Sequence, residues 1–552
     1  MHVRHYGIFV AYPPTVDLRD QGLGRHLAMF LKGAEPIDDI KFTILCPSWT
    51  KDALESLFES EQVSASIFDV VAPSRKPYAL RLYELFRAYR ARPKRPSLVT
   101  RFVGAAVGSG KKIVDTVSAR GVAVYNVWSL ILFVLYAVPL AVVFLPFAVI
   151  LSPLILLVSV VGRLSFLWKY IGSRIAKNKW VTVFRRYSSL MEKPEAHAWV
   201  LDLFDKMQEK ELRRMWSKLK AVEDIRAWYC PTAFWPAFHK IKAPRLMCVP
   251  DVVLCDFPVG FSGVGGDRFL RTFEAVETAI RGGEYFVTYS ETVKWNTLVD
   301  RYNVPADNVA VIQHATNSLD ALVNIHGFEN GDVPSRNFCQ GLLVDALRKS
   351  GNYAYAANFS NLNVKFLFYA SQLRPNKNVL LLLRAYEHLL RKRYLGHKLL
   401  LTGSPAAMPE IWRFVVENRL EGDVLFLHGL SISELAACYK LADIAVNPTL
   451  SEGGCPFTFT EALSVGTPVV MSRIPVAQEI LSDEKLSRLT FFDPYSWKDC
   501  ANRIEWAVHN RQKLLEVQKV AYQALSGRTW SDVVREHVDV LEKIAVRAQS
   551  RL

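Results

Sequence analysis

Two carboxylates flank a glycine-rich turn in the sequence PTLSEGGCPFTFTEALSVGTPVVMS, which covers residues 448–472. Glu452 lies in the turn, and Glu461 lies one turn into the short helix predicted over residues 457–465. The free backbone N–H groups at the start of such a helix attract phosphate. A carboxylate can also accept hydrogen bonds from two sugar hydroxyls. The combination indicates a nucleotide-sugar site; the alternative is a glycine-rich turn followed by a surface helix with two solvated glutamates.

The segments around this turn predict its place in a fold. Residues 444–446 form an apolar run typical of a buried strand, and residues 467–472 predict the next strand. Gly466 and Pro468 end the helix between them, because glycine just past a helix and proline soon after it are stop signals. The order strand, turn, helix, strand predicts an α/β fold in which the turn lies at the carboxyl end of a parallel strand, where ligands bind.

A second charged turn follows another predicted strand, VKFLFYASQ, at the start of the second half of the chain. It contains Arg374 and Lys377, in the sequence Leu-Arg-Pro-Asn-Lys-Asn. Two cations at the carboxyl end of a strand suit a diphosphate, because they can neutralise the charge that grows on a departing nucleoside diphosphate. A solvated basic turn is the alternative interpretation.

The N-terminal half of the chain predicts a similar alternation of strands and helices. YGIFVAYPP reads as a first buried strand, and Gly22 and Gly24 open a helix soon after it. Further strands and helices are predicted up to about residue 72, and the alternation resumes between residues 226 and 317. A parallel sheet interrupted by a long insertion explains this pattern.

Length and cysteine usage limit the class of protein. A chain of 552 residues of which half are hydrophobic exceeds one core, so we expect two large domains. The eight cysteines are scattered and contain no Cys-x-x-Cys pair, which argues against a zinc site and against a disulfide scaffold. A reduced, cytosolic environment fits this pattern. The N-terminus has no long apolar segment typical of a signal peptide.

The net charge of +15 is concentrated around one segment. Residues 76–120 contain eleven basic side chains against two acidic ones, and residues 163–186 contain seven basic side chains and no acidic one. The rest of the chain is close to neutral. Nucleic-acid binding is therefore disfavoured, because the charge borders an apolar segment rather than lying among aromatic residues on a polar face.

The segment between the two basic stretches is uncharged. Residues 121–162 contain no Asp, Glu, Lys, Arg or His. As one helix they would be roughly 60 Å long, about twice the hydrocarbon thickness of a bilayer, and Pro139, Pro146 and Pro153 interrupt such a helix. Basic flanks on both sides predict that both ends lie on the cytoplasmic face. We therefore expect a hydrophobic membrane hairpin, either two short spans or a re-entrant loop, whose basic flanks attract anionic lipids; a pair of buried core helices is the alternative.

The segment around Glu461 resembles the signature of retaining glycosyltransferases of family 4. Glu461-Ala462-Leu463 and the sequence Gly-Thr-Pro-Val-Val at residues 466–470 match that signature. Glu452 and Glu461 enclose eight residues where the family has seven. The resemblance implies the GT-B fold, two Rossmann-like domains facing a cleft, and it covers most of the chain outside residues 76–194.

The resemblance also implies roles for individual residues. Glu461 would hold the ribose, and Glu452 with the amides of Gly453, Gly454, Cys455, Pro456 and Phe457 would bind the sugar and phosphate, although proline itself has no amide hydrogen. Lys377 and Arg374 would stabilise the departing diphosphate; the family has its Arg five positions before the Lys, where this chain has Gln372.

On the acceptor side of the cleft, the resemblance places the Gly22 and Gly24 turn, Asp251 and His314. Asp251 stands where the family has a His-Asp pair, but Pro250 replaces the histidine. A tight turn, a turn cap and a structural histidine are the alternatives for these positions.

Together these features predict a retaining, metal-independent hexosyltransferase of the α/β class. It would use a nucleotide-diphosphate sugar, with no other cofactor, and a lipid-linked or membrane-proximal glycan acceptor in bacterial surface polysaccharide synthesis, at the cytoplasmic face of the inner membrane. The alternatives are another GT-B enzyme, such as a nucleotide-sugar epimerase or a phosphorylase, and a non-catalytic membrane scaffold. The predicted units are an N-terminal domain split by a membrane-associating insertion, a nucleotide-sugar domain, and a helix returning to the first domain (1–75 and 196–330; 76–195; 331–525; 526–552).

Overall fold

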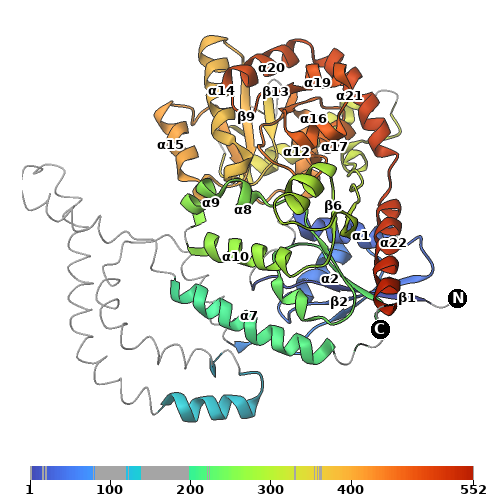
Figure 1. Ribbon diagram of the computed structural model, residues 1–552. Helices are drawn as coiled ribbons and strands as arrows, with labels where there is room; N and C mark the ends of the chain where they lie inside the picture. The colour runs from blue at the N-terminus through green and yellow to red at the C-terminus, as the bar shows by residue number, and fades with distance from the viewer. Residues whose placement is uncertain are drawn as a thin grey trace, which may run out of the picture.

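The structure is a computed structural model of the whole chain (Figure 1). It describes residues 3–80, 120–138 and 198–550, apart from short gaps at 15–17, 19–21, 79, 122–123, 220–221, 223, 266, 329–330, 353–354, 357–358 and 360–363. Two separate sheets lie one above the other in Figure 1, each covered by helices.

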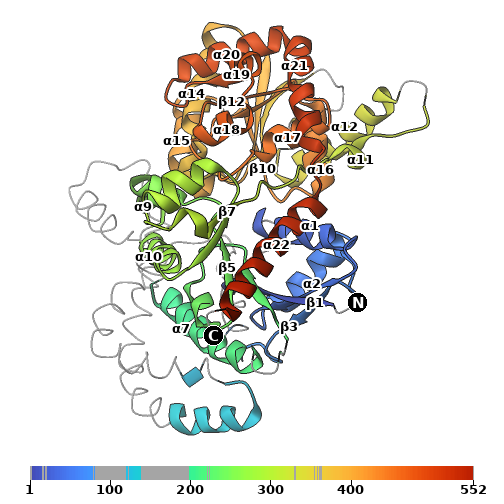
Figure 2. The same cartoon turned by 45° about the vertical axis from the view of Figure 1, so that its right-hand side comes forward.

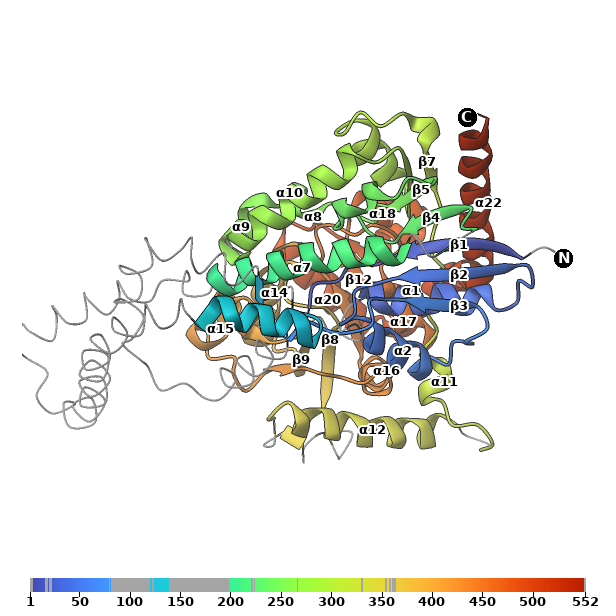
Figure 3. The ribbon, with the colours of Figure 1, turned by 90° about the horizontal axis from the view of Figure 1, so that it is seen from below.

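The first sheet has seven parallel strands in the order β3-β2-β1-β4-β5-β6-β7. Its central strands are almost wholly buried apolar runs, as parallel strands covered on both faces require. The strands are β1 (Arg4–Phe9), β2 (Ile40–Leu45), β3 (Phe68–Val71), β4 (Ala227–Cys230), β5 (Arg245–Cys248), β6 (Tyr285–Thr288) and β7 (Val309–Val311). Figure 3 shows β1, β2 and β3 side by side. The other four strands of this sheet come from beyond residue 198, after the insertion.

Helices connect and cover this sheet. They are α1 (Gly22–Ala34), α2 (Lys51–Ser60), α7 (Ala198–Leu219), α8 (Val253–Asp256), α9 (Pro258–Gly265), α10 (Asp267–Arg281) and the short helical elements η3 (Pro236–Lys240), η4 (Val293–Val299) and η5 (Ala306–Asn308). In α7 the Glu211 carboxylate is buried, accepts the Ser48 N–H at 2.7 Å and pairs with Arg214 at 2.8 Å. A helix far along the chain is thereby fixed to the end of β2, so the insertion leaves the sheet intact.

The second sheet has six parallel strands in the order β10-β9-β8-β11-β12-β13. Its strands are β8 (Lys365–Tyr369), β9 (His397–Thr402), β10 (Val424–Leu427), β11 (Ile444–Asn447), β12 (Val469–Ser472) and β13 (Phe491–Phe492). The strands predicted over VKFLFYASQ, over residues 444–446 and over residues 467–472 are confirmed as β8, β11 and β12. The two parallel sheets confirm the predicted α/β class.

The second sheet is covered on both faces by helices. Leading into it are α11 (Asp320–Val323) and α12 (Asp332–Lys349); around it lie η6 (Pro375–Lys377), α14 (Val379–Lys392), η7 (Pro405–Ala407), α15 (Pro409–Glu417), α16 (Ile432–Leu441), α17 (Phe457–Ser464), α18 (Pro475–Ile480), α19 (Glu484–Thr490), α20 (Trp497–His509) and α21 (Arg511–Ser526). Two buried clusters, one on each face of the sheet, form the core of this domain.

The last helix, α22 (Trp530–Gln549), leaves the second domain and packs on the first (Figure 2). A capping box formed by Thr529 and Asp532 fixes where it starts. Gly33 of α1 lies against the backbone of Trp530, where an added Cβ would come within 2.6 Å of the carbonyl group. The close approach of α1 and α22 ties the end of the chain to the first domain.

The predicted membrane hairpin falls largely on residues 139–162, which lie outside the described residues. Residues 127–138 form a short helix, and Tyr125 just before it receives the Arg214 guanidinium of α7 over its ring at 3.7 Å. None of the helices in the described ranges is both long enough and apolar enough to cross a bilayer.

We predict that Gln518→Ala destabilises the second domain by about 1–3 kcal/mol, because it strips buried backbone groups of their partners. The fully buried Gln518 amide accepts the Val469 N–H at 2.9 Å and donates to the Val469 carbonyl at 2.6 Å and to Thr490 Oγ1 at 2.9 Å. Urea titration followed by fluorescence measures the change. Gln512→Ala, at an exposed position on the same helix, should leave the midpoint unchanged; equal effects of the two substitutions would contradict the assignment.

Candidate active site

The glycine-rich turn lies at the carboxyl end of β11, beside the turn that follows β8. Backbone hydrogen bonds join the two turns, since the Leu450 N–H donates to the Asn376 carbonyl at 2.8 Å and Thr449 Oγ1 donates to the same oxygen at 3.3 Å. Lys377 Nζ then lies 2.5 Å from Glu452 Oε1. Two of the predicted site residues, 75 positions apart in the sequence, therefore form one ion pair at the edge of the sheet.

Arg374 lies in the same turn but makes a different contact. Its guanidinium donates to Gln372 Oε1 at 2.6 Å, and the side chain is exposed. Asn378 ends the turn in the left-handed backbone conformation, with a φ of 52°. Its side-chain amide donates a hydrogen bond to the Pro494 carbonyl. Lys377 is thus held by Glu452 and Arg374 by Gln372. Burial lowers the pKa of Arg374 and the charges of Asp251 and Glu452 raise it, so the guanidinium charge also lies near these two carboxylates.

Glu461 is buried in the first turns of α17. Burial raises the pKa of the Glu461 carboxyl to about 7, and the Arg25 guanidinium acts in the opposite direction. Arg25 comes from α1 of the first domain, and its Nη1 lies 3.4 Å from Glu461 Oε1. A contact between the two domains therefore acts directly on this carboxylate.

The turn that carries Glu452 is packed against the first domain. An added Cβ at Gly453 would lie 2.0 Å from the Pro250 carbonyl oxygen, and one at Gly454 would lie 2.9 Å from Tyr289 Cβ. Ser290 Oγ also donates to the Gly453 carbonyl at 3.1 Å. Only residues without a side chain fit here, so the two glycines allow the domains to close on the turn.

His314 lies on the other side of the same turn. Its ring stacks on Phe457 with centroids 4.4 Å apart, and an added Cβ at Gly454 would lie 3.1 Å from its Nε2. Burial lowers the pKa of His314, so the ring is neutral at physiological pH. His314 supports the start of α17 as a packing partner.

Asp251 follows Pro250 and faces the Lys377–Glu452 pair across the cleft. Burial and the Glu452 carboxylate raise the pKa of Asp251 to about 6, while the Lys377 and Arg374 charges lower it. Asp251 is thus ionised at neutral pH and can accept a hydrogen bond from a hydroxyl group.

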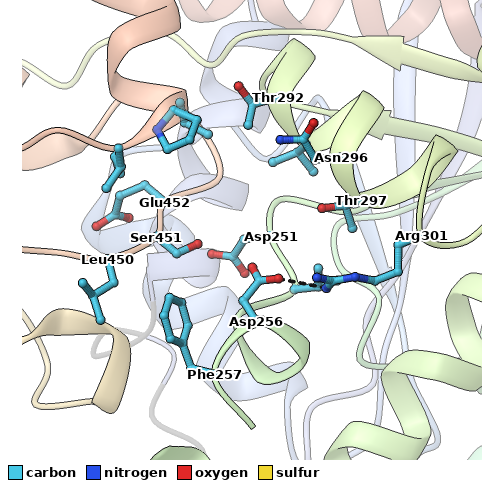
Figure 4. A pocket seen from close by; sticks show the side chains of 15 residues that line it. Asp251, Asp256, Phe257, Thr292, Asn296, Thr297, Arg301, Leu450, Ser451 and Glu452 are labelled. Atoms are coloured by element: carbon cyan, nitrogen blue, oxygen red, sulfur yellow. Dashed lines mark hydrogen bonds and ion pairs between the residues drawn. The ribbon is translucent and has the colours of Figure 1, made fainter. Parts of the chain in front are cut away.

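A cavity of about 290 Å³ opens between the domains beside Asp251 and Glu452 (Figure 4). Figure 4 shows Asp251 beside Ser451 and next to Asp256, which bonds to Arg301, with Glu452 nearby. Hydroxyl and amide side chains in or next to η4 and apolar residues of both domains complete the lining: Thr292, Asn296, Thr297, Val252, Phe257, Val293, Leu450, Ile474, Pro475 and Val476. Such a wall suits a polyhydroxylated ligand, because hydroxyls, amides and carboxylates can each bond a sugar hydroxyl.

Residues 355–524 match the family model "Glycosyl transferases group 1". The chain is 24% identical over 234 residues to the O-antigen chain mannosyltransferase RfbU of Salmonella typhimurium, which covers 42% of this chain and 53% of that protein. It is 25% identical over 176 residues to the lipopolysaccharide 1,2-N-acetylglucosaminetransferase of the same organism, covering 31% and 46%. The chain thus spans about half the length of these relatives.

The fold has a counterpart among solved structures. The N-terminal domain of trehalose-6-phosphate phosphatase from Candida albicans superposes with a TM-score of 0.54 at 10% identity, over 99% of this chain and 97% of that one. This likeness concerns the fold alone. The match to the group 1 model covers the domain that carries Lys377, Glu452 and Glu461.

The structure brings most of the predicted site residues to one cleft. The residues that it brings together are Lys377, Glu452, Glu461, Asp251, His314 and the turn from Gly453 to Phe457. Cys455 is no candidate nucleophile, because burial raises the pKa of its thiol to about 12. Gly24 lies against the Leu18 carbonyl and Gly22 begins α1, so the two glycines shape the turn that carries Arg25.

Two residues at the cleft were missed in the sequence. Arg25 directly follows Gly24, and that position at a helix start is the one signal that could have indicated it. Glu479 of α18 accepts the backbone N–H groups of Glu291 and Thr292 at 2.8 and 2.9 Å and the Thr292 hydroxyl at 2.7 Å. A carboxylate at the start of a helix in the other domain stabilises closure, and only the fold reveals it.

We predict that Gly453→Ala shifts the protein toward a more open arrangement of its domains. The new Cβ would collide with the Pro250 backbone, and overpacking of this kind costs about 1–3 kcal/mol. Small-angle X-ray scattering should give a larger radius of gyration. Gly341→Ala on α12, where nothing lies within 4 Å of the added Cβ, serves as the control; an unchanged radius in Gly453→Ala would contradict the prediction.

Proposed function

We propose that this protein is a retaining glycosyltransferase that moves a hexosyl group from a nucleotide-diphosphate donor to a glycan acceptor. The observation that carries the proposal is the Lys377–Glu452 ion pair at the carboxyl ends of β8 and β11. The buried Glu461 lies in the helix that follows the Glu452 turn, and the first domain packs against this turn. The match of this domain to the group 1 model supports it.

The donor would lie along the turn between β11 and α17. The Glu461 carboxylate would accept hydrogen bonds from the two ribose hydroxyls, and the free backbone N–H groups at the start of α17 would bind phosphate oxygens. Lys377 and Arg374 would neutralise the charge that develops on the departing diphosphate, which is usually the largest contribution to the rate of such reactions. These cations make a metal ion and any further cofactor unnecessary.

The acceptor would enter through the cavity beside Asp251. Asp251 would accept a hydrogen bond from the attacking hydroxyl and orient it, and Glu452 would hold the transferred sugar. The acceptor oxygen attacks the anomeric carbon on the face from which the diphosphate leaves, the bond to the diphosphate breaks, and a phosphate oxygen of the leaving group takes the hydroxyl proton. The anomeric configuration is retained.

The acceptor would be a lipid-linked glycan of a bacterial surface polysaccharide, processed at the cytoplasmic face of the inner membrane. The names of two relatives, an O-antigen chain mannosyltransferase and a lipopolysaccharide transferase, support this class. The helix at 127–138 supports membrane contact, because Trp128, Leu132 and Leu135 are 77%, 69% and 67% exposed. The basic stretches at 76–120 and 163–186 would bind anionic lipid head groups.

The test compares the purified wild type with Lys377→Ala on a panel of UDP-, GDP- and dTDP-sugars plus a bacterial lipid extract. We expect release of nucleoside diphosphate from one donor and a loss in kcat of roughly 100-fold in Lys377→Ala, as for the removal of one stabilising charge. Lys392→Ala, on the exposed end of α14, should retain full activity. No turnover of any donor, or equal activity of the two variants, would contradict the proposal.

The proposed membrane contact of the helix at 127–138 leads to a separate prediction. Trp128→Ser with Leu135→Ser should lower co-sedimentation with phosphatidylglycerol vesicles at least several-fold, because each large apolar side chain contributes about 1.5–3 kcal/mol when it leaves water. Val520→Ser on α21, 68% exposed and in the second domain, is the matched control and should change nothing. Equal vesicle binding by all three proteins would rule out the helix at 127–138 as the contact.

A further inference from the structure

Arg25 is the one residue of the first domain whose charge acts on Glu461 among the described residues. Its Nη1 lies 3.4 Å from Glu461 Oε1, and the side chains are 24% and 8% exposed. Ion pairs that are largely removed from water hold their geometry better than surface pairs, because solvent and salt screen them less. The pair crosses from α1 to α17, so it exists only while the domains are together.

The start of α1 holds Arg25 in place from both sides. Before it, an added Cβ at Gly24 would lie 2.3 Å from the Leu18 carbonyl oxygen. After it, the buried His26 ring lies 3.2 Å from the Tyr289 hydroxyl and packs edge-on against Trp530. The Arg25 side chain is therefore aimed at the cleft by packing of the backbone and of its neighbour.

One donor group of Arg25 has no partner. Its Nε–H is buried and makes no hydrogen bond within the described part of the chain. A buried donor without a partner costs free energy, so such a group indicates a place where a ligand atom can bind. The orphaned Nε–H belongs to the side chain that touches the predicted ribose-binding carboxylate.

Glu461 accepts hydroxyl hydrogen bonds best as a carboxylate, and a nearby cation favours that form over the neutral acid. The charged and titratable side chains that face it in the described structure are Arg25 from α1 and Tyr439 from α16. Both favour the carboxylate over the neutral acid: the Arg25 charge contributes most, and the buried, neutral Tyr439 hydroxyl contributes less through a hydrogen bond. A carboxylate has about four lone-pair sites, and one contact with Arg25 leaves room for two hydroxyl groups.

We propose that Arg25 is a residue of the donor site, supplied by the opposite domain. It holds Glu461 ionised and oriented for the ribose hydroxyls, and its free Nε–H binds an oxygen of the nucleoside diphosphate. The donor site is complete only when the domains are closed, so nucleotide binding and closure stabilise each other. This inference rests on the proposed function, because it takes Glu461 as a nucleotide-binding residue.

The experiment measures the dissociation constants of UDP, GDP, ADP and dTDP by calorimetry between pH 6 and 9. The variants are Arg25→Gln, Arg25→Lys and Glu461→Gln, with Lys32→Ala on the same helix as the control. We expect Arg25→Gln to weaken binding of the preferred nucleotide by roughly 10- to 100-fold at pH 7.5. Arg25→Lys should recover most of the affinity, and Lys32→Ala should bind like the wild type.

The pH profile separates a positioning role from a packing role. Binding requires ionised Glu461, so wild-type affinity should fall as the pH drops through about 7. Without the cation the carboxylate keeps its proton to higher pH, so the midpoint in Arg25→Gln should move upward by about one unit or more. A loss of affinity with an unmoved midpoint would show that Arg25 does not keep Glu461 ionised, and it would overturn the proposal.

Two further outcomes would also overturn it, in distinguishable ways. If Glu461→Gln loses affinity while Arg25→Gln binds like the wild type, Arg25 has no part in the donor site and the proposed function stands. If the wild type binds none of the four nucleotides, the proposed function and this inference fall together.

Discussion

The site depends on how closely the turn after β11 approaches the first domain. Gly453 and Gly454 lie against Pro250 and Tyr289 at distances that leave no room for a side chain. This approach places Asp251 opposite Glu452 and brings Arg25 to Glu461. Parallel strands supply the two polar turns, but without the glycines the two halves of the cleft would remain apart.

The charges in the cleft form two sets with different tasks. Lys377 and Glu452 pair within the second domain and stay partly exposed, so they can exchange partners with a ligand at low cost. Arg25 and Glu461 pair between domains in a largely buried place, where ionisation of the glutamate depends on the arginine. Glu452 of the first pair lines the cavity between the domains, whereas the second pair joins the two domains directly.

The sequence predicted those parts of the structure that local patterns determine. Apolar runs followed by glycine or proline predicted β8, β11, β12 and α17, because a parallel strand and its turn are encoded within about 25 residues. The order of these elements then predicted that Lys377 and Glu452 lie in turns after β8 and β11 and that Glu461 lies in the helix after the second turn.

Contacts between distant segments could not be predicted in this way. Arg25 and Glu479 reach the cleft from α1 and α18, and their partners lie 436 and 187 or 188 positions away along the chain. Glu479 has no local signature, and the position of Arg25 after Gly24 at a helix start is a weak one, because a charged side chain on a helix is usually solvated. The closeness of Gly453 to Pro250 also requires the docking of one domain on the other, which is a property of the whole fold.

A crystal structure of the protein with the nucleoside diphosphate of its donor tests the account most directly. The account predicts that the diphosphate contacts Lys377 and the amides of the turn before α17, that the ribose hydroxyls bond to Glu461, and that the domains remain closed. A nucleotide bound elsewhere, or one in this cleft whose ribose makes no contact with Glu461, would contradict it.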